Sequence, residues 1–276
     1  MQFSIMQGRL VPPSDGRFQC FPRERWRDEF ALAQAAGLTG IEWIYDLYGA
    51  DANPLATDDG LKLIDALSAE TGVTVRSLCA DYFMDRPLLR AGEAELDELV
   101  NILLWLLGRC DSAGIGRVVM PFVDASRIES DDDCDRLVAV MGRIAPILEK
   151  TGIEVHLETS LTPASFADLL ARLPHPSFKV NYDSGNSASL GYDTRLEFAA
   201  YGPRIGSVHI KDRVEGGGTV PLGTGDADFE ALFECLAAIG YANGFVLQVA
   251  RSAPGDEVDW AVQNREFVLA RQAKAV

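Results

Sequence analysis

IEVHLETS, residues 153–160, is the first of four short apolar runs in the second half of the chain, and it is followed by FKVNYDSGN (178–186), IGSVHIKD (205–212) and GFVLQVAR (244–251). Each run has the length of a β-strand and is rich in Val, Ile, Leu and Phe. Each run also carries a polar residue where the strand is expected to end, namely Glu158, Asp183, His209 and Gln248. Polar side chains at four successive strand ends predict one shared site.

The alternation of strand and helix extends over the whole sequence. Strands are expected at 3–8, 40–46, 73–80, 117–123, 153–159, 178–183, 205–211 and 244–250. Helices are expected at 24–36, 57–71, 93–113, 131–151, 163–173, 196–201, 228–239 and 256–272. Successive parallel strands need crossover helices, and eight such units can close into a barrel. We therefore predict an α/β fold, a single (β/α)8 TIM barrel that forms one domain over residues 1–276.

An open doubly wound sheet is the alternative fold, and two features of the sequence disfavour it. The first strand is not followed by a G-x-G-x-x-G turn, and the composition shows no sign of a second domain. The loops that follow the strands are long and polar, whereas those that precede the strands are short. In a barrel the long loops emerge at the carboxyl ends of the strands, where active sites of this fold lie.

Charge and composition exclude several classes of partner. The chain has 41 acidic and 25 basic residues, a formal net charge of −16, which opposes binding to nucleic acid or an anionic membrane. No segment approaches the roughly 20 apolar residues of a membrane span, and the N-terminus lacks a signal-peptide pattern. Five widely spaced cysteines without a C-x-x-C pair fit a reduced chain. We expect a cytoplasmic protein, with a homodimer as a possible assembly.

The four strand-end side chains offer a donor set for a metal ion. Because side chains alternate along a strand, Glu158, Asp183, His209 and Gln248 can all be the last inward-pointing residue of their strands. Carboxylate, imidazole and carboxamide groups suit a divalent cation. We expect manganese, with magnesium, cobalt or zinc as alternatives. A single polar residue at a strand end is more often structural, so the prediction depends on the convergence of all four.

The motifs around these residues resemble those of a known family. They are the strand that ends in Glu158, VNYDSGN (180–186), VHIKDR (208–213), PLGTGDADF (221–229) and the strand with Gln248. The sequence resembles sugar isomerases and epimerases with a xylose isomerase-like TIM barrel, a group similar to ketose and sugar-phosphate 3-epimerases, inosose dehydratases and, more distantly, endonuclease IV. The resemblance implies Glu, Asp, His and Glu as metal ligands, with both glutamates exchanging the substrate proton.

Gln248 departs from that pattern. Its amide oxygen can bind a metal, but the side chain has no basic form near neutral pH. Glu158 is then the expected general base, and Lys211 is expected to reach a substrate oxygen. One base suffices for aldose–ketose isomerisation or for dehydration. Epimerisation needs a second acid/base, for which the candidates are Glu42, Asp81, His156 and Lys211.

Other polar residues near the predicted mouth are candidates for substrate binding. They are Arg9, Glu42, His156, Asn186 and Arg213. Arg213 matches a substrate-binding arginine of similar epimerases, and the position of Asn186 is polar in the family. A satisfied core histidine, a buried salt bridge or a solvated mouth residue is an equally good structural explanation for most of them.

These features predict a divalent-metal-dependent isomerase or epimerase. Its substrate is expected to be a small sugar or polyol, with or without a phosphate group, and the reaction is expected to pass through an enediolate. The alternatives are a lyase of the inosose dehydratase type and a sugar-binding barrel that lacks catalysis. A nuclease is disfavoured, because the chain has three histidines and a strong negative charge.

Overall fold

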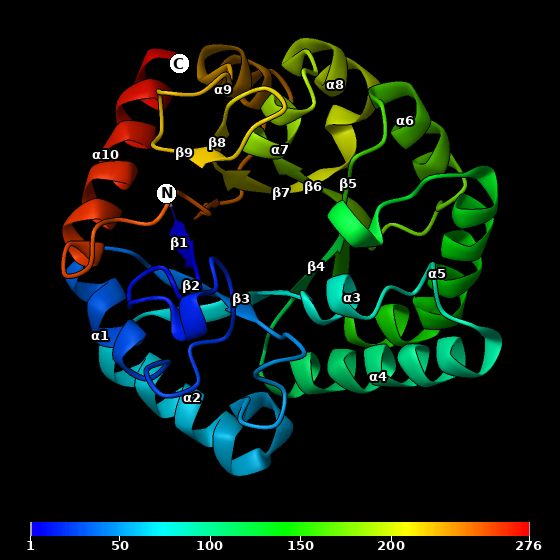
Figure 1. Ribbon diagram of the computed structural model, residues 1–276, viewed down its shortest axis with the longest axis horizontal. Helices are drawn as coiled ribbons and strands as arrows, with labels where there is room; N and C mark the ends of the chain where they lie inside the picture. The colour runs from blue at the N-terminus through cyan, green and yellow to red at the C-terminus, as the bar shows by residue number, and fades with distance from the viewer. Residues whose placement is uncertain (1, 276) are drawn as a thin grey trace.

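Eight parallel strands close into a barrel in the computed structural model, which describes residues 2–275 (Figure 1). Their order around the barrel is β1-β10-β7-β6-β5-β4-β3-β2. The strands are β1 (Phe3–Met6), β2 (Gly40–Ile44), β3 (Thr74–Cys79), β4 (Arg117–Phe122), β5 (Glu154–Thr159), β6 (Phe178–Asp183), β7 (Ile205–Ile210) and β10 (Phe245–Leu247). The predicted (β/α)8 barrel is confirmed.

Helices form a ring around the strands (Figure 1). The larger ones are α1 (Asp28–Ala35), α2 (Asp58–Thr71), α4 (Glu93–Ser112), α5 (Asp131–Thr151), α6 (Pro163–Ala171), α8 (Thr194–Tyr201), α9 (Phe229–Ala238) and α10 (Glu257–Ala275). All eight overlap the helices expected from the sequence. Within residues 2–275, none of the helices combines the length and apolarity needed to cross a membrane.

Helix α5 shows how the sequence sets the outer ring. Ser130 precedes the helix, and its side chain accepts a hydrogen bond from the backbone N–H of Asp133. Gly152 follows with a φ of 73°, a left-handed conformation that closes the helix. The buried face repeats every three or four residues and consists of Leu137, Val140, Met141, Ile144 and Leu148. This face packs the helix onto the barrel.

Several short elements at the mouth were not expected from the sequence. They are α3 (Tyr82–Asp85), α7 (Ser184–Ser189) and a hairpin of β8 (Asp212–Arg213) and β9 (Thr219–Val220). Helix α7 begins directly after β6 because the Asp183 side chain accepts hydrogen bonds from the backbone N–H groups of Gly185 and Asn186. Strand β10 ends at Leu247, before the expected residue 250. Gln248 therefore lies one residue beyond the strand.

Glu29 on α1 supports the loop that follows β1. Its side chain is fully buried and accepts a 2.6 Å hydrogen bond from the backbone N–H of Gly8. Gly8 has a φ of 81°, and a Cβ there would lie 3.0 Å from the Cys20 carbonyl oxygen, so the turn requires glycine. Burial raises the pKa of Glu29 to about 8.

Replacing Glu29 with Gln should make stability less dependent on pH. The folded protein holds this proton up to about pH 8, whereas an unfolded glutamate loses it above about 4.5. The free energy of unfolding of the wild type therefore falls as pH rises between these values. The difference in free energy of unfolding between Glu29→Gln and the wild type should therefore shift in favour of the variant by more than about 1 kcal/mol between pH 5 and pH 8. One pKa unit corresponds to about 1.4 kcal/mol.

Urea denaturation at several pH values measures this difference, with the exposed Glu24→Gln as a matched control. An equal loss of stability for Glu29→Gln at every pH would show that the glutamate is not held protonated in the folded chain.

Candidate metal centre

A cavity of about 370 Å³ opens at the carboxyl ends of the strands. Its lining comes from elements that are far apart in the sequence and includes Gln19, Asp81, Glu158, Asn186, Lys211 and Gln248. The β8–β9 hairpin contributes Arg213 and Thr219 to the same lining. The long loops and polar strand ends therefore meet at one mouth, as expected for this fold.

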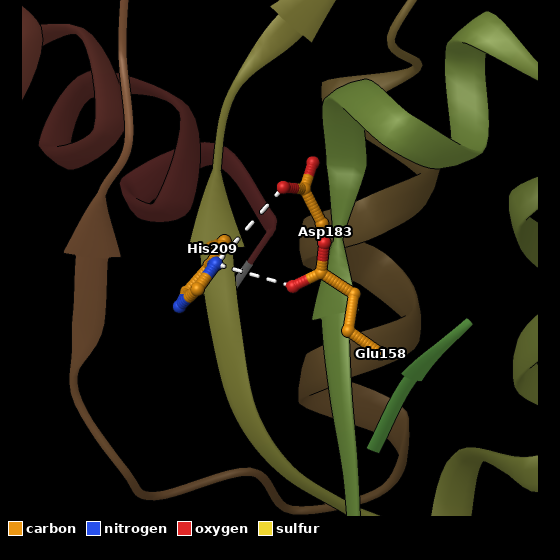
Figure 2. A group of neighbouring side chains, drawn as sticks. All are labelled: Glu158, Asp183 and His209. Carbon is orange, nitrogen blue, oxygen red and sulfur yellow. Dashed lines mark ion pairs between the residues drawn. The ribbon is translucent and has the colours of Figure 1, made fainter. Parts of the chain in front are cut away.

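Glu158, Asp183 and His209 form a buried cluster (Figure 2), and Glu158 also lines this cavity. One ligand atom from each residue lies within 4.8 Å of the other two. His209 Nδ1 is 3.5 Å from Glu158 Oε2 and 4.0 Å from Asp183 Oδ2. The three residues come from the neighbouring strands β5, β6 and β7, and Asp183 pairs with His209 in the β6–β7 register. Figure 2 shows the imidazole edge facing both carboxylates.

Glu42 on β2 fixes the orientation of the His209 ring. Its Oε1 lies 2.6 Å from His209 Nε2, and both side chains are fully buried. Pairing with His209 outweighs the opposing effect of burial and lowers the pKa of Glu42, so this carboxylate accepts the Nε2 proton. His209 Nδ1 then faces the other two carboxylates and has no hydrogen-bond partner among residues 2–275. A carboxylate behind a ligating histidine is the usual support of a metal site.

Glu158 is positioned by two amides. Asn181 Nδ2 donates to its Oε2 at 2.7 Å, and Asn186 Nδ2 donates to its Oε1 at 2.5 Å. Burial and then the nearby Asp183 carboxylate raise the pKa of Glu158 to about 7. A carboxylate with this pKa can both accept and return a proton near neutral pH.

The two oxygens of the Asp183 carboxylate have different partners. Its Oδ1 accepts hydrogen bonds from the backbone N–H groups of Gly185 and Asn186, at 2.9 and 2.8 Å. Its Oδ2 faces the cluster, where Lys211 Nζ lies 3.5 Å away. The first turn of α7 therefore holds one oxygen of the carboxylate and leaves the other for a ligand.

Gln248 presents its oxygen to the mouth because of a hydrogen-bond chain that begins at Arg9. The guanidinium can only donate, and its Nη2 donates to Gln19 Oε1 at 3.0 Å. Gln19 Oε1 therefore accepts, and Gln248 Nε2 donates to the same atom at 3.1 Å. Gln248 Oε1 is left to face Lys211 Nζ at 3.3 Å. The carboxamide is thus turned so that its oxygen, and not its nitrogen, is available to a cation.

The residues of this cluster fit a divalent metal ion. Two carboxylates and an imidazole nitrogen without a hydrogen-bond partner among residues 2–275 meet at one buried point, which is a donor set for manganese, zinc or a similar ion. Without a counter-charge, two adjacent buried carboxylates are costly. Glu158, Asp183 and His209 are the residues that could hold the ion, and Gln248, whose Oε1 lies 3.3 Å from Lys211 Nζ, stays a predicted fourth ligand.

Three other predicted site residues, Asn186, Lys211 and Arg213, line the cavity. Lys211 Nζ lies 3.3 Å from Asn186 Oδ1, and Arg213 Nη1 donates to that same oxygen at 2.9 Å. Arg213 also donates twice to the carbonyl oxygen of Gly217 in the hairpin. Asn186 therefore links both cations to Glu158.

Three predicted substrate contacts lie away from the cavity lining. Glu42 is behind His209. Arg9 is 5% exposed, and its guanidinium donates to the carbonyl oxygens of Val249 and Phe18 and to Gln19. His156 is fully buried between Ser207 Oγ, at 2.7 Å, and Glu154 Oε2, at 3.0 Å. In the structure these three residues contact protein groups that support the site.

Asn181 and Gln19 support the site, but the sequence pattern indicates such a position only for Asn181. Asn181 shares the strand and parity of Asp183, so alternation places it one layer below the cluster. Gln19 lies in a long loop, and no spacing or pattern marks it. Its position depends on the fold of residues 7–27 over the mouth.

Comparisons with known proteins agree with this architecture. A family model described as xylose isomerase-like TIM barrel matches residues 30–271. L-ribulose-5-phosphate 3-epimerase UlaE of Shigella boydii is 26% identical over 264 residues, covering 91% of this chain and 92% of that protein. A solved L-ribulose 3-epimerase superimposes with a TM-score of 0.78 at 20% identity and covers 100% of this chain and 96% of its own. The IOLI protein with a bound zinc atom gives a TM-score of 0.76 at 17% identity, covering 100% and 99%.

Replacing Glu42 with Gln should weaken metal binding about 10- to 100-fold, the usual effect of removing the carboxylate behind a ligating histidine. The substitution keeps the size of the side chain but removes the charge that orients and polarises His209. Calorimetric titration of the metal-free protein with Mn²⁺ measures the affinity. Asp124→Asn, which changes an exposed acid elsewhere on the mouth, is the control. Equal affinities for Glu42→Gln and wild type would contradict this role of Glu42.

Proposed function

The chain belongs to the family of xylose isomerase-like TIM barrels, and from this membership we propose that it is a divalent-metal-dependent isomerase or epimerase of a small sugar, polyol or sugar phosphate. The observation that carries the proposal is the convergence of Glu158, Asp183 and His209 at the base of a cavity large enough for such a substrate. The curated relatives and structural neighbours that are named as sugar epimerases support the same class of enzyme.

Each polar group at the mouth has a task in this proposal. When bound, a divalent cation, with manganese as the first choice, supplies the positive charge that makes a C–H bond next to a carbonyl more acidic. Glu158 accepts that proton, and the amides of Asn181 and Asn186 hold its carboxylate in place. Lys211 and Arg213 donate hydrogen bonds to substrate oxygens at the side of the cavity formed by α7 and the hairpin.

Gln248 favours a second candidate reaction. Since its amide cannot accept a proton, Glu158 is the only one of the four strand-end residues to which we assign proton transfer. One base can move a proton between neighbouring carbons in aldose–ketose isomerisation, or can start the elimination of a β-hydroxyl as a lyase does.

The five free cysteines are consistent with our further proposal of a cytoplasmic, reducing location.

Proton transfer should be visible as deuterium incorporation. Metal-loaded protein in D2O with manganese should label the carbon next to the carbonyl of at least one sugar in a panel that includes L-ribulose and L-ribulose 5-phosphate, as read by NMR. Glu158→Gln should reduce the labelling rate at least about 100-fold, because it removes the proton acceptor.

Glu154→Gln is the matched control, since Glu154 lies on the same strand with the same parity but at the opposite end, where it contacts His156. It should label at nearly the wild-type rate. Sugar binding by the wild type without any labelling would contradict both the isomerase and the lyase and would indicate a binding protein.

A further inference from the structure

Epimerisation requires two acid/base groups, because a proton removed from one face of a carbon must be replaced on the other. In the strand-end cluster Glu158 supplies the first group, whereas Gln248 cannot supply the second. The lining of the cavity contains four further carboxylates, those of Asp46, Asp81, Asp85 and Asp124. Their burial and hydrogen bonds indicate which of the four carboxylates is suited to proton transfer.

Three of these carboxylates are poorly suited to proton transfer. Asp46 uses both oxygens as acceptors for backbone N–H groups, from Phe21 at 2.7 Å and Gly49 at 2.6 Å. Asp85 lies at the rim, where Tyr48 Oη donates to it. Asp124 is exposed to solvent. None of the three combines burial with a side-chain partner that it shares with a strand-end residue, among the residues that the structure describes.

Asp81 has both properties. It follows β3, lines the cavity and is 8% exposed. Its Oδ2 accepts a hydrogen bond from Gln19 Nε2 at 2.8 Å, and its Oδ1 lies 3.0 Å from Cys79 Sγ. The same Gln19 side chain accepts a hydrogen bond from Gln248 Nε2 at 3.1 Å, so one amide joins Asp81 to Gln248, and Asp81 and Glu158 line the same cavity. Asp81 thus approaches the substrate cavity from a strand different from that of Glu158.

We propose that Asp81 is the second acid/base of this enzyme, which makes the reaction an epimerisation with Asp81 in the role that Gln248 cannot fill. This inference rests on the proposed function and deepens it by choosing epimerisation over one-base isomerisation. Asp81 is a catalytic residue in this proposal because it exchanges a proton with the reacting carbon.

The hydrogen-bond chain from Arg9 explains why the acid is Asp81 and not residue 248. Arg9 forces Gln19 Oε1 to accept, so Gln19 Nε2 must donate, and Asp81 Oδ2 is its acceptor. A glutamate at position 248 would place a carboxylate oxygen against Gln19 Oε1, where the Gln248 amide now donates at 3.1 Å. The loop after β1 therefore suits an amide at 248 and a carboxyl group at 81.

The proton balance of the step is simple. Glu158, as carboxylate, takes the proton from one face of the carbon next to the carbonyl, and the electron pair of the C–H bond moves onto the carbonyl. Asp81, as carboxylic acid, gives its proton to the opposite face, and the pair returns to form the new C–H bond. Burial raises the pKa of Asp81, which favours this acid form. Proton exchange with water then restores both groups, and the product is an isomer of the substrate.

Asp81→Asn separates the two half-reactions. The introduced amide keeps an oxygen for Gln19 Nε2, and thermal unfolding should show a melting temperature close to that of the wild type. With manganese-loaded protein in D2O and a ketose that the wild type epimerises, formation of the second epimer should fall at least about 100-fold. The starting epimer whose proton faces Glu158 should still take up deuterium at its reacting carbon, within about threefold of the wild-type rate.

Two further variants complete the test. Glu158→Gln should lose that exchange, and Asp85→Asn, a rim acid outside the proposed machinery, should epimerise normally. Epimerisation by Asp81→Asn within about threefold of wild type would overturn the proposal, as would loss of exchange together with epimerisation. A wild type that exchanges deuterium and converts aldose to ketose without epimerising any sugar would overturn the role of Asp81 and leave the proposed function standing. A wild type that labels no sugar would overturn both.

Discussion

The mouth of this barrel depends on the placing of two carboxylates, Glu158 and Asp183, side by side in a buried position. Such a pair is unfavourable unless positive charge lies between or beside its members. The chain surrounds it with the amide donors of Asn181 and Asn186 and with the Lys211 cation, and His209 Nδ1 faces both carboxylates. A divalent cation completes this arrangement better than hydrogen bonds alone, because it balances two charges at one point.

Support for the site extends one layer behind the ligand set. Glu42 fixes the ring of His209, and Ser207 donates to Asn181 Oδ1 at 2.6 Å, which turns the Asn181 amide nitrogen toward Glu158. Arg9 does the same for Gln248 through Gln19. Each of these hydrogen bonds fixes the orientation of one amide or imidazole group. The donor atoms are therefore arranged by the protein before any ligand enters, which lowers the cost of binding.

The sequence predicts the fold and the centre of the site better than their surroundings. Period-two alternation and strand-end placement are local properties, so they locate Glu158, Asp183 and His209 and the eight strands. Gln19 could not be found in this way, because its contacts depend on a long loop folding across the barrel mouth. Arg9 and His156 bond protein groups in the structure, and their contact with substrate stays a prediction, because sequence shows which side chains are polar but not what they face. Helix α7 was missed because its start depends on the Asp183 side chain.

The central claim is that one divalent cation binds at the strand ends and that Gln248 is a ligand through its oxygen. Crystals grown with manganese chloride and examined by anomalous scattering at the manganese edge test this claim directly. The account predicts one strong peak, coordinated by Glu158, Asp183, His209 Nδ1 and Gln248 Oε1, with Gln248 Nε2 still bonded to Gln19. A peak at another place, or no peak in crystals saturated with manganese, would contradict it.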